Sequence, residues 1–182
     1  NELVAIMGNF VNRVMVLSHK YFGGQVALGS ALLPSDQIIL DELAKFPLEI
    51  SRSLEQYRFR EALGLFMQAA RLGNKYLADE EPWKVYKTDE ERVKTVLYVA
   101  AQIVANLAVL AQPFLPKTAN KLFDMLNLPT QDWAAAGRSD LLSVGHQLGE
   151  ASLLFEKITD EQVDFQLQKL AAAKALNVLE AS

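Results

Sequence analysis

Apolar side chains recur at helical spacing through most of the chain, beginning with its first residues. The apolar positions of the first stretch are Leu3, Val4, Met7, Phe10, Val11, Val14 and Leu17. This spacing defines one helical face, so residues 1–21 are predicted to form an amphipathic helix that ends at Gly23-Gly24. A separate row of the helical wheel contains Glu2, Ile6, Asn9 and Arg13, with Asn1 and Asn12 beside it.

Asn9 and Arg13 are the two residues of this row with planar hydrogen-bonding groups. They are one helical turn apart, so their amide and guanidinium groups can reach the same point. Such a pair suits the edge of a nucleobase or a carboxylate. From the residues alone, a solvated face with Arg13 in a surface ion pair is the more common situation.

A second and a third helix are predicted from the same periodicity. Ser35 is the expected N-cap of the second helix, with Asp36 in its first turn, where a carboxylate complements the helix dipole. Pro47 should kink or split that helix. The third helix is predicted over residues 59–77, and Pro82 after it is expected in a turn or at a first helical position.

The fourth helix is predicted to be the centre of the bundle. Thr88 with Glu91 three residues later forms a capping-box pattern that opens it. Residues 93–111 are apolar nearly all round, which indicates burial on every side. Gln102 and Asn106 are one turn apart, and we expect them to hydrogen-bond each other or a neighbouring backbone inside the bundle.

The remaining chain is predicted to hold one short helix, an irregular segment and a final helix. The short helix covers residues 117–126, and the irregular segment covers 127–157 with a short hairpin near Gly-His-Gln-Leu-Gly. Thr159 and Gln162 form a cap pattern for the last helix. The fold class is therefore all-α: an irregular antiparallel bundle of about five main helices plus a C-terminal helix. We expect residues 1–158 to form the bundle and 159–182 to be a helix and frayed tail of the same domain.

Composition excludes several classes of protein. The chain has 182 residues, no cysteine, two histidines and a formal charge of −4. There is thus no disulfide framework or thiolate metal site, and His19 and His146 are too far apart in sequence to suggest a metal-ligand cluster. The negative charge argues against a general polyanion binder such as a DNA-binding domain. The longest apolar run, residues 96–111, is too short and too polar for a membrane span, so no membrane partner is expected.

No motif for catalysis is visible. Neither histidine lies near a strand-to-helix nucleophile turn, and the glycines lack the strand, lysine and helix of a phosphate loop. The carboxylates at 80–81 and 89–91 lie at helix boundaries, where cap and dipole effects explain them. We therefore assign no catalytic residue and no metal ligand to this chain.

Three stretches, taken together, resemble the anticodon-binding helical domain of methionyl-tRNA synthetase. They are NELVAIMGNFVNR followed by SHKYFGG, then GNKYLADEEPWK, and then QPFLP followed by GHQLG and LLFEKI. The resemblance runs in order from about Asn1 to Leu170. It implies a fragment of a class I aminoacyl-tRNA synthetase, whose nucleotide-binding motifs do not occur in this sequence.

The resemblance also implies partners and cofactors. The partners would be methionine tRNA, through its anticodon loop, and the catalytic domain of the same polypeptide, in the cytoplasm. This chain would hold no cofactor. ATP with Mg, and Zn where present, would be bound by the catalytic domain, which attaches methionine to tRNA.

The family reads a CAU anticodon, which by resemblance assigns roles to particular residues. Trp83, after Pro82, would stack on the first anticodon base, and Arg13 and Asn9 would hold base edges or a phosphate. Weaker candidates are Asn1, Asn12 and Lys84. Without the resemblance, Trp83 can equally be a core residue with its indole N–H satisfied.

Two departures and two alternatives accompany this interpretation. Some bacterial relatives have Asn at the position of Glu2 and Arg at that of Ile6, so these two positions are not expected to donate hydrogen bonds.

One alternative is the anticodon-binding domain of a sibling synthetase for cysteine, leucine, isoleucine or valine. The other is a helical interaction domain with no RNA role. The remaining basic residues near the predicted site are expected to be solvated surface: Arg58, Arg60 and Lys87.

Overall fold

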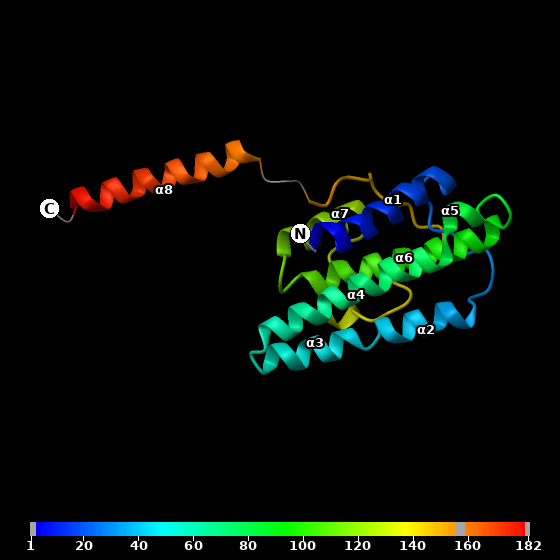
Figure 1. Cartoon of the computed structure of the whole chain (residues 1–182). Coiled ribbons are helices and arrows are strands. Elements are labelled where there is room, and N and C mark those ends of the chain that lie inside the picture. The colour runs from blue at the N-terminus through cyan, green and yellow to red at the C-terminus, as the bar shows by residue number, and fades with distance from the viewer. Residues whose placement is uncertain (1–2, 156–158, 181–182) are drawn as a thin grey trace.

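The computed structural model describes residues 3–155 and 159–180, and it is helical as predicted, with no strand in those ranges. Figure 1 shows the long helices lying side by side as a bundle, with one further helix outside it. The elements in chain order are η1 (Leu3–Gly8), α1 (Asn9–Phe22), α2 (Pro34–Leu43), α3 (Phe46–Glu55), α4 (Phe59–Glu80), α5 (Pro82–Val85), α6 (Glu90–Ala111), α7 (Pro116–Met125), η2 (Trp133–Ala135) and α8 (Asp160–Glu180). The all-α prediction is confirmed.

Helix α6 is the core of the bundle. Every residue from Val99 to Ala111 is buried, and α1, α2, α4, α5 and α7 all pack against this helix. Length and composition alone would allow α6 to cross a membrane, but 89% of its most apolar window is buried inside the bundle, as in the core helix of a globular protein.

Two polar side chains buried in the second half of α6, Gln102 and Asn106, make structural hydrogen bonds. Gln102 donates to the carbonyl of Leu142 at 2.6 Å, and Asn106 donates to the carbonyl of Arg138 at 2.8 Å. Both bonds attach the irregular segment after α7 to the core helix. The prediction that these amides bond to backbone inside the bundle is therefore confirmed.

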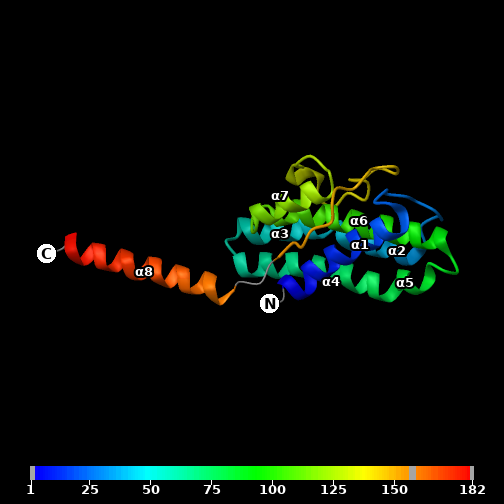
Figure 2. The ribbon, with the colours of Figure 1, turned by 90° about the horizontal axis from the view of Figure 1, so that it is seen from above.

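Helix α8 extends away from the bundle in both views (Figures 1 and 2). Its predicted cap is present: Gln162 N donates to the Thr159 hydroxyl at 3.3 Å, and Thr159 N donates to the Gln162 side chain at 3.1 Å. The side chains from Thr159 to Ala171 are exposed. The assignment of residues 1–158 and 159–182 to one domain stays a prediction.

Two predicted caps are wrong by one or two residues. Helix α2 begins with Pro34 at its first position, so Leu33 is the N-cap and Ser35 lies inside the helix. Asp36 still occupies the first turn and accepts a hydrogen bond from Leu33 N at 2.9 Å. Helix α6 is capped by Asp89, which accepts from Arg92 N at 2.9 Å, and the Thr88 hydroxyl bonds to the carbonyl of Val85 instead.

Other boundaries follow the punctuating residues. Pro47 lies in the first turn of α3, so the predicted second helix is split in two, and Gly23 ends α1 in a left-handed conformation with φ 62°. The hairpin predicted near residues 145–149 is absent. Gln147 pairs instead with Gln25 in an isolated antiparallel bridge, which ties this loop to the end of α1.

At Gly73, helix α4 packs closely against the side chains of α1 and α6. A Cβ atom there would lie 2.5 Å from the ring of Phe10 and 3.0 Å from Ile103, whereas a Cβ atom at Gly64 of the same helix would meet nothing within 4 Å. We predict that Gly73→Ala lowers the free energy of unfolding, because overpacking costs about 1–3 kcal/mol and outweighs the gain of about 1 kcal/mol in helix propensity. Gly64→Ala is the matched control and should stabilise the protein in the same urea titration. Equal effects at both sites would contradict the prediction.

Candidate nucleic-acid interface

Arg13 and Trp83 lie against each other where α1 meets α5. The guanidinium carbon of Arg13 is 4.6 Å from the centroid of the Trp83 ring, the geometry of a cation–π contact. Nη1 of Arg13 also donates a long hydrogen bond, 3.5 Å, to Oδ1 of Asn74 on α4. Trp83 keeps 36% of its surface exposed, so it is not a core tryptophan. The structure thus brings together the two residues on which the predicted site most depends.

The position of Trp83 follows from a sharp bend after α4. Glu81 takes a left-handed conformation with φ 41°, which is costly for a residue with a side chain. Pro82 follows as the first residue of α5, as predicted, and is buried. The bend and the buried proline place the indole of Trp83 beside α1 and close to solvent.

A buried ion-pair network holds the end of α4. The guanidinium of Arg92 donates two hydrogen bonds to the fully buried carboxylate of Asp36, at 2.6 and 2.8 Å, and lies 2.7 Å from Glu80. The hydroxyl of Tyr76 donates to the same Asp36 carboxylate at 2.7 Å. Because Glu80 is the last residue of α4, this network fixes the point from which the chain turns toward Trp83.

The charge states inside this network are well defined. Burial alone would raise the pKa of Asp36, but hydrogen bonds from Arg92, Tyr76 and the Leu33 amide outweigh it, and the net pKa lies below the ordinary value. Burial and the bond to Asp36 raise the pKa of Tyr76. The bond to Asp36 raises the pKa of Arg92. At neutral pH the network therefore holds an ionised Asp36, a neutral Tyr76 and a charged Arg92.

The other predicted site residues have different surroundings. Asn9 is exposed at the start of α1, one turn before Arg13, and Asn12 is half-buried. Lys84 forms an ion pair with Glu81 at 2.7 Å and is exposed. Asn1 lies outside the described residues.

The row of side chains drawn on a single helical wheel is interrupted before Asn9. Residues Leu3–Gly8 form a π-helix, whose hydrogen bonds span one residue more than those of an α-helix. The wheel that groups Asn9 with Arg13 therefore does not extend back to Ile6. Ile6 is half-buried and packs against the core, whereas Asn9 is exposed.

Sequence reasoning did not single out several neighbours of this surface. Asn74 contacts Arg13. The sequence feature that could have identified Asn74 is its position after Gly73 in the stretch GNKYLADEEPWK. The rings of Tyr21 and Tyr86 stack at 3.9 Å and 11°, and Lys20 lies 5.6 Å from the Tyr21 ring. Tyr86 is three residues after Trp83, so this pair continues the aromatic surface toward the end of α1.

The two histidines make structural hydrogen bonds. His19 Nε2 donates to the carbonyl of Gly149 at 2.8 Å and His146 Nε2 donates to that of Leu126 at 2.7 Å, so both rings fasten loops. Within residues 3–155 and 159–180, no group of three or more His, Asp or Glu side chains is placed to hold a metal ion.

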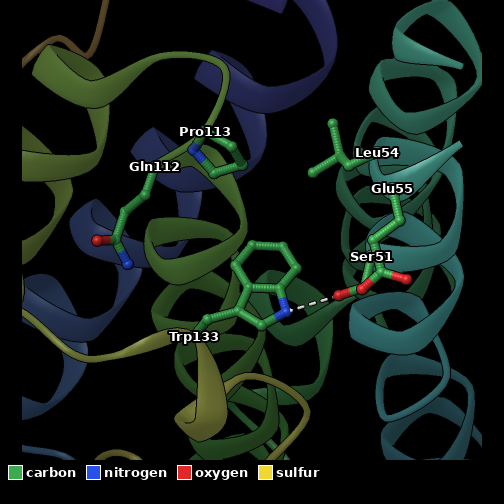
Figure 3. A pocket seen from close by; sticks show the side chains of 6 residues that line it. All are labelled: Ser51, Leu54, Glu55, Gln112, Pro113 and Trp133. Atoms are coloured by element: carbon green, nitrogen blue, oxygen red, sulfur yellow. Dashed lines mark hydrogen bonds between the residues drawn. The ribbon is translucent and has the colours of Figure 1, made fainter. Parts of the chain in front are cut away.

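A hollow between α3 and the α6–α7 connection contains the second tryptophan (Figure 3). The indole N–H of Trp133 donates to the Ser51 hydroxyl at 2.9 Å, which ties the irregular segment to α3. Leu54 and Pro113 supply apolar walls, and Glu55 is the one charged residue that lines the hollow. This arrangement explains Trp133 as a packing residue.

Solved structures with the same fold include methionyl-tRNA synthetase from Mycobacterium tuberculosis. Its apo form aligns with a TM-score of 0.77 over 87% of this chain and 33% of that chain, at 23% identity. The form bound by methionyl-adenylate gives a TM-score of 0.76 over 86% and 32%, also at 23% identity. The chain thus has the fold of a helical part of these solved structures.

Sequence comparison then identifies the family. The family described as the anticodon binding domain of methionyl tRNA ligase matches residues 26–175. Methionine–tRNA ligase of Cytophaga hutchinsonii is 55% identical over 98% of this chain and 26% of that protein. The corresponding ligase of Christiangramia forsetii is 54% identical over 99% and 27%. The chain belongs to the family of methionyl-tRNA ligase anticodon-binding domains, and it spans about a quarter of the length of these relatives.

The resemblance drawn from the motifs is therefore confirmed. Because the matched family is the methionyl one, the alternative of a sibling synthetase for cysteine, leucine, isoleucine or valine is wrong.

Proposed function

We propose that this chain is the module with which a methionine–tRNA ligase reads the CAU anticodon of its tRNA. The observation that carries the proposal is the contact of Arg13 with a part-exposed Trp83 on an anchored bend. Unpaired bases are recognised by stacking on aromatic rings and guanidinium planes and by hydrogen bonds to their edges. Trp83 would stack on the cytosine, while Arg13 and Asn9 would donate to base edges or a phosphate.

The remainder of the longer polypeptide would carry the chemistry. It would attach methionine to tRNA in the cytoplasm and would bind ATP with Mg, and Zn where present. Because the net charge of this chain is −4, its contribution to affinity should come from local contacts and not from general attraction to phosphate.

The proposal is tested by base discrimination. In the full-length protein, the fluorescence anisotropy of a labelled anticodon stem-loop should report tighter binding for CAU than for a loop whose first base is uracil. The fluorescence of Trp83 should be quenched by the first loop and less by the second. Equal affinity for both loops would overturn the proposal. No binding at physiological salt would favour an interaction domain without an RNA role.

Arg13→Lys should weaken tRNA binding although the positive charge is kept. Lysine lacks the planar donors of arginine and stacks poorly on an aromatic ring, so it loses the contact to Trp83 and the geometry for a base edge. We expect an increase in Kd of several-fold in the same anisotropy assay. Arg52→Lys, at an exposed arginine on α3, is the control and should leave Kd unchanged. Equal Kd values for Arg13→Lys and the unmodified protein would contradict a role for the guanidinium.

A further inference from the structure

The turn that joins α3 to α4 exposes an unusual group of apolar side chains. Tyr57 is 81% exposed, Phe59 60% and Leu63 43%. The rings of Tyr57 and Phe59 pack edge to face, 6.2 Å apart and at 84°. Large apolar side chains gathered on a surface mark an interaction site more often than isolated ones do. We call these three residues, with Arg58 and Arg60 between them, the α3–α4 tip.

The backbone of the tip is strained in a way that points to use of the tyrosine side chain. Tyr57 takes a left-handed conformation with φ 59°. A residue with a side chain costs on the order of 1 kcal/mol or more there, whereas glycine or asparagine would make the same turn more cheaply. The tyrosine ring makes little contact inside the bundle, so packing within the bundle does not offset the cost of the left-handed backbone.

The tip is also held in a fixed shape. Tyr57 N donates to the carbonyl of Leu54 at 3.0 Å, and Arg58 N donates to that of Ser53 at 2.8 Å. The buried hydroxyl of Ser53 donates to Glu61 at 2.9 Å, which fastens the start of α4 to α3. The exposed rings are therefore presented on a preformed surface, which lowers the entropy cost of binding.

The tip lies at the end of the bundle where the described chain enters and leaves. The element η1 packs against α4. Phe155, which ends the first described range, lies beside Gly8 of η1. Figures 1 and 2 both show the start of η1 and the start of α8 toward the α3–α4 end, with α5 at the other end. A part of the same polypeptide attached there would lie at the end of the bundle that carries the tip.

The length of the relatives indicates which partner covers the α3–α4 tip. They are about four times as long as the region they share with this chain, so most of the polypeptide lies outside it. We propose that the α3–α4 tip is the surface on which this bundle docks against the remaining part of its own polypeptide. That part would offer an apolar hollow for Tyr57 and Phe59, rimmed by carboxylates. The inference rests on the family assignment and does not depend on the roles proposed for Arg13 and Trp83.

The charges at the tip support this partner. Arg58 lies 3.8 Å from Glu61 in an exposed pair, and Arg60 makes no ion pair with any residue that the structure describes. Carboxylates on the partner surface would form ion pairs with both arginines. RNA fits less well, because Leu63 and the carboxylate of Glu61 share the surface. The 22 residues of α4 also separate the tip from the Trp83 bend by about 33 Å.

Hydroxyl-radical footprinting of the full-length protein tests the inference. Tyr57 and Phe59 should be oxidised several-fold more slowly than exposed Phe165 of α8, both with and without methionine tRNA. Trp83 should be protected only when tRNA is added, which tests the proposed function separately. Protection of Tyr57 that requires tRNA would overturn the inference in favour of an RNA contact. Oxidation of Tyr57 at the rate of a free tyrosine in both states would overturn it in favour of a free surface.

A substitution gives a second measurement. Tyr57→Asn combined with Phe59→Ser should preserve the bundle, because asparagine suits the left-handed conformation. In the full-length protein, calorimetry should show the bundle unfolding at a lower temperature and separately from the rest. Ile38→Ser, at an apolar residue of α2 that is 60% exposed, is the control and should leave the transition unchanged. An unchanged transition in the double variant would contradict docking at the tip.

Discussion

Trp83→Ala in the full-length protein is expected to lower kcat/KM for aminoacylation of methionine tRNA by roughly 5- to 150-fold, because stacking of one base is typically worth about 1–3 kcal/mol. The substitution removes the proposed platform for cytosine and also the ring that lies 4.6 Å from the Arg13 guanidinium. The loss should appear with tRNA as the varied substrate. Methionine activation, measured as ATP–pyrophosphate exchange without tRNA, should be unchanged.

Two further variants make this result specific. Trp83→Phe keeps an aromatic face and should recover most of the loss. Trp133→Phe changes the other tryptophan, whose indole bonds to Ser51 on α3, and should lower stability without changing KM for tRNA. Unchanged kinetics in Trp83→Ala would rule out the stacking role. An equal loss of ATP–pyrophosphate exchange would show that the variant disturbs the enzyme as a whole.

The helices of the bundle could be predicted because each one buries a face or, in α6 from Val99 to Ala111, its whole circumference. Burial of a face requires apolar residues at helical spacing, which the sequence shows directly, and glycines and prolines mark the ends of the helices. The caps were harder to predict. Ser35 is a good capping residue by type, but Pro34 at the first helical position moves the cap to Leu33. Backbone geometry, which side-chain preference does not specify, decides between adjacent candidates.

The residues of the candidate site could be predicted from the sequence, but their arrangement in space could not. The period placed Asn9 and Arg13 together, and the resemblance added Trp83. The contact between Arg13 and Trp83 depends on the left-handed Glu81 and on the close approach of α1 to α4 at Gly73. Neither feature has a local sequence signature. The π-helix at Leu3–Gly8 was equally invisible, because an apolar stripe is compatible with either hydrogen-bonding pattern.

The largest stability effect is expected from a residue that the sequence presented as an ordinary first-turn carboxylate. Asp36→Asn should lower the free energy of unfolding by about 3–5 kcal/mol, because removing one partner of a buried ion pair leaves the other without compensation. Arg92 would keep only Glu80, which is itself partly exposed. Urea unfolding of the protein at neutral pH, followed by circular dichroism, measures the change.

Asp41→Asn on the same helix provides the control. Asp41 is exposed and accepts one hydrogen bond from Gln37, so its substitution should change stability by less than about 0.5 kcal/mol.

The pH dependence distinguishes a lost charge from a general packing defect. The pKa of Asp36 is lowered in the folded protein, so its contribution is complete above the unfolded carboxyl value of about 3.9 and is lost as pH falls through the folded value. Arg92 remains charged throughout, because its pKa is raised. The gap in stability between the unmodified protein and Asp36→Asn should therefore be constant near neutrality and should shrink below roughly pH 4. A gap that persists unchanged into acid would mean that the asparagine disturbs packing and that the charge of Asp36 is not what holds α2 to α4 and α6.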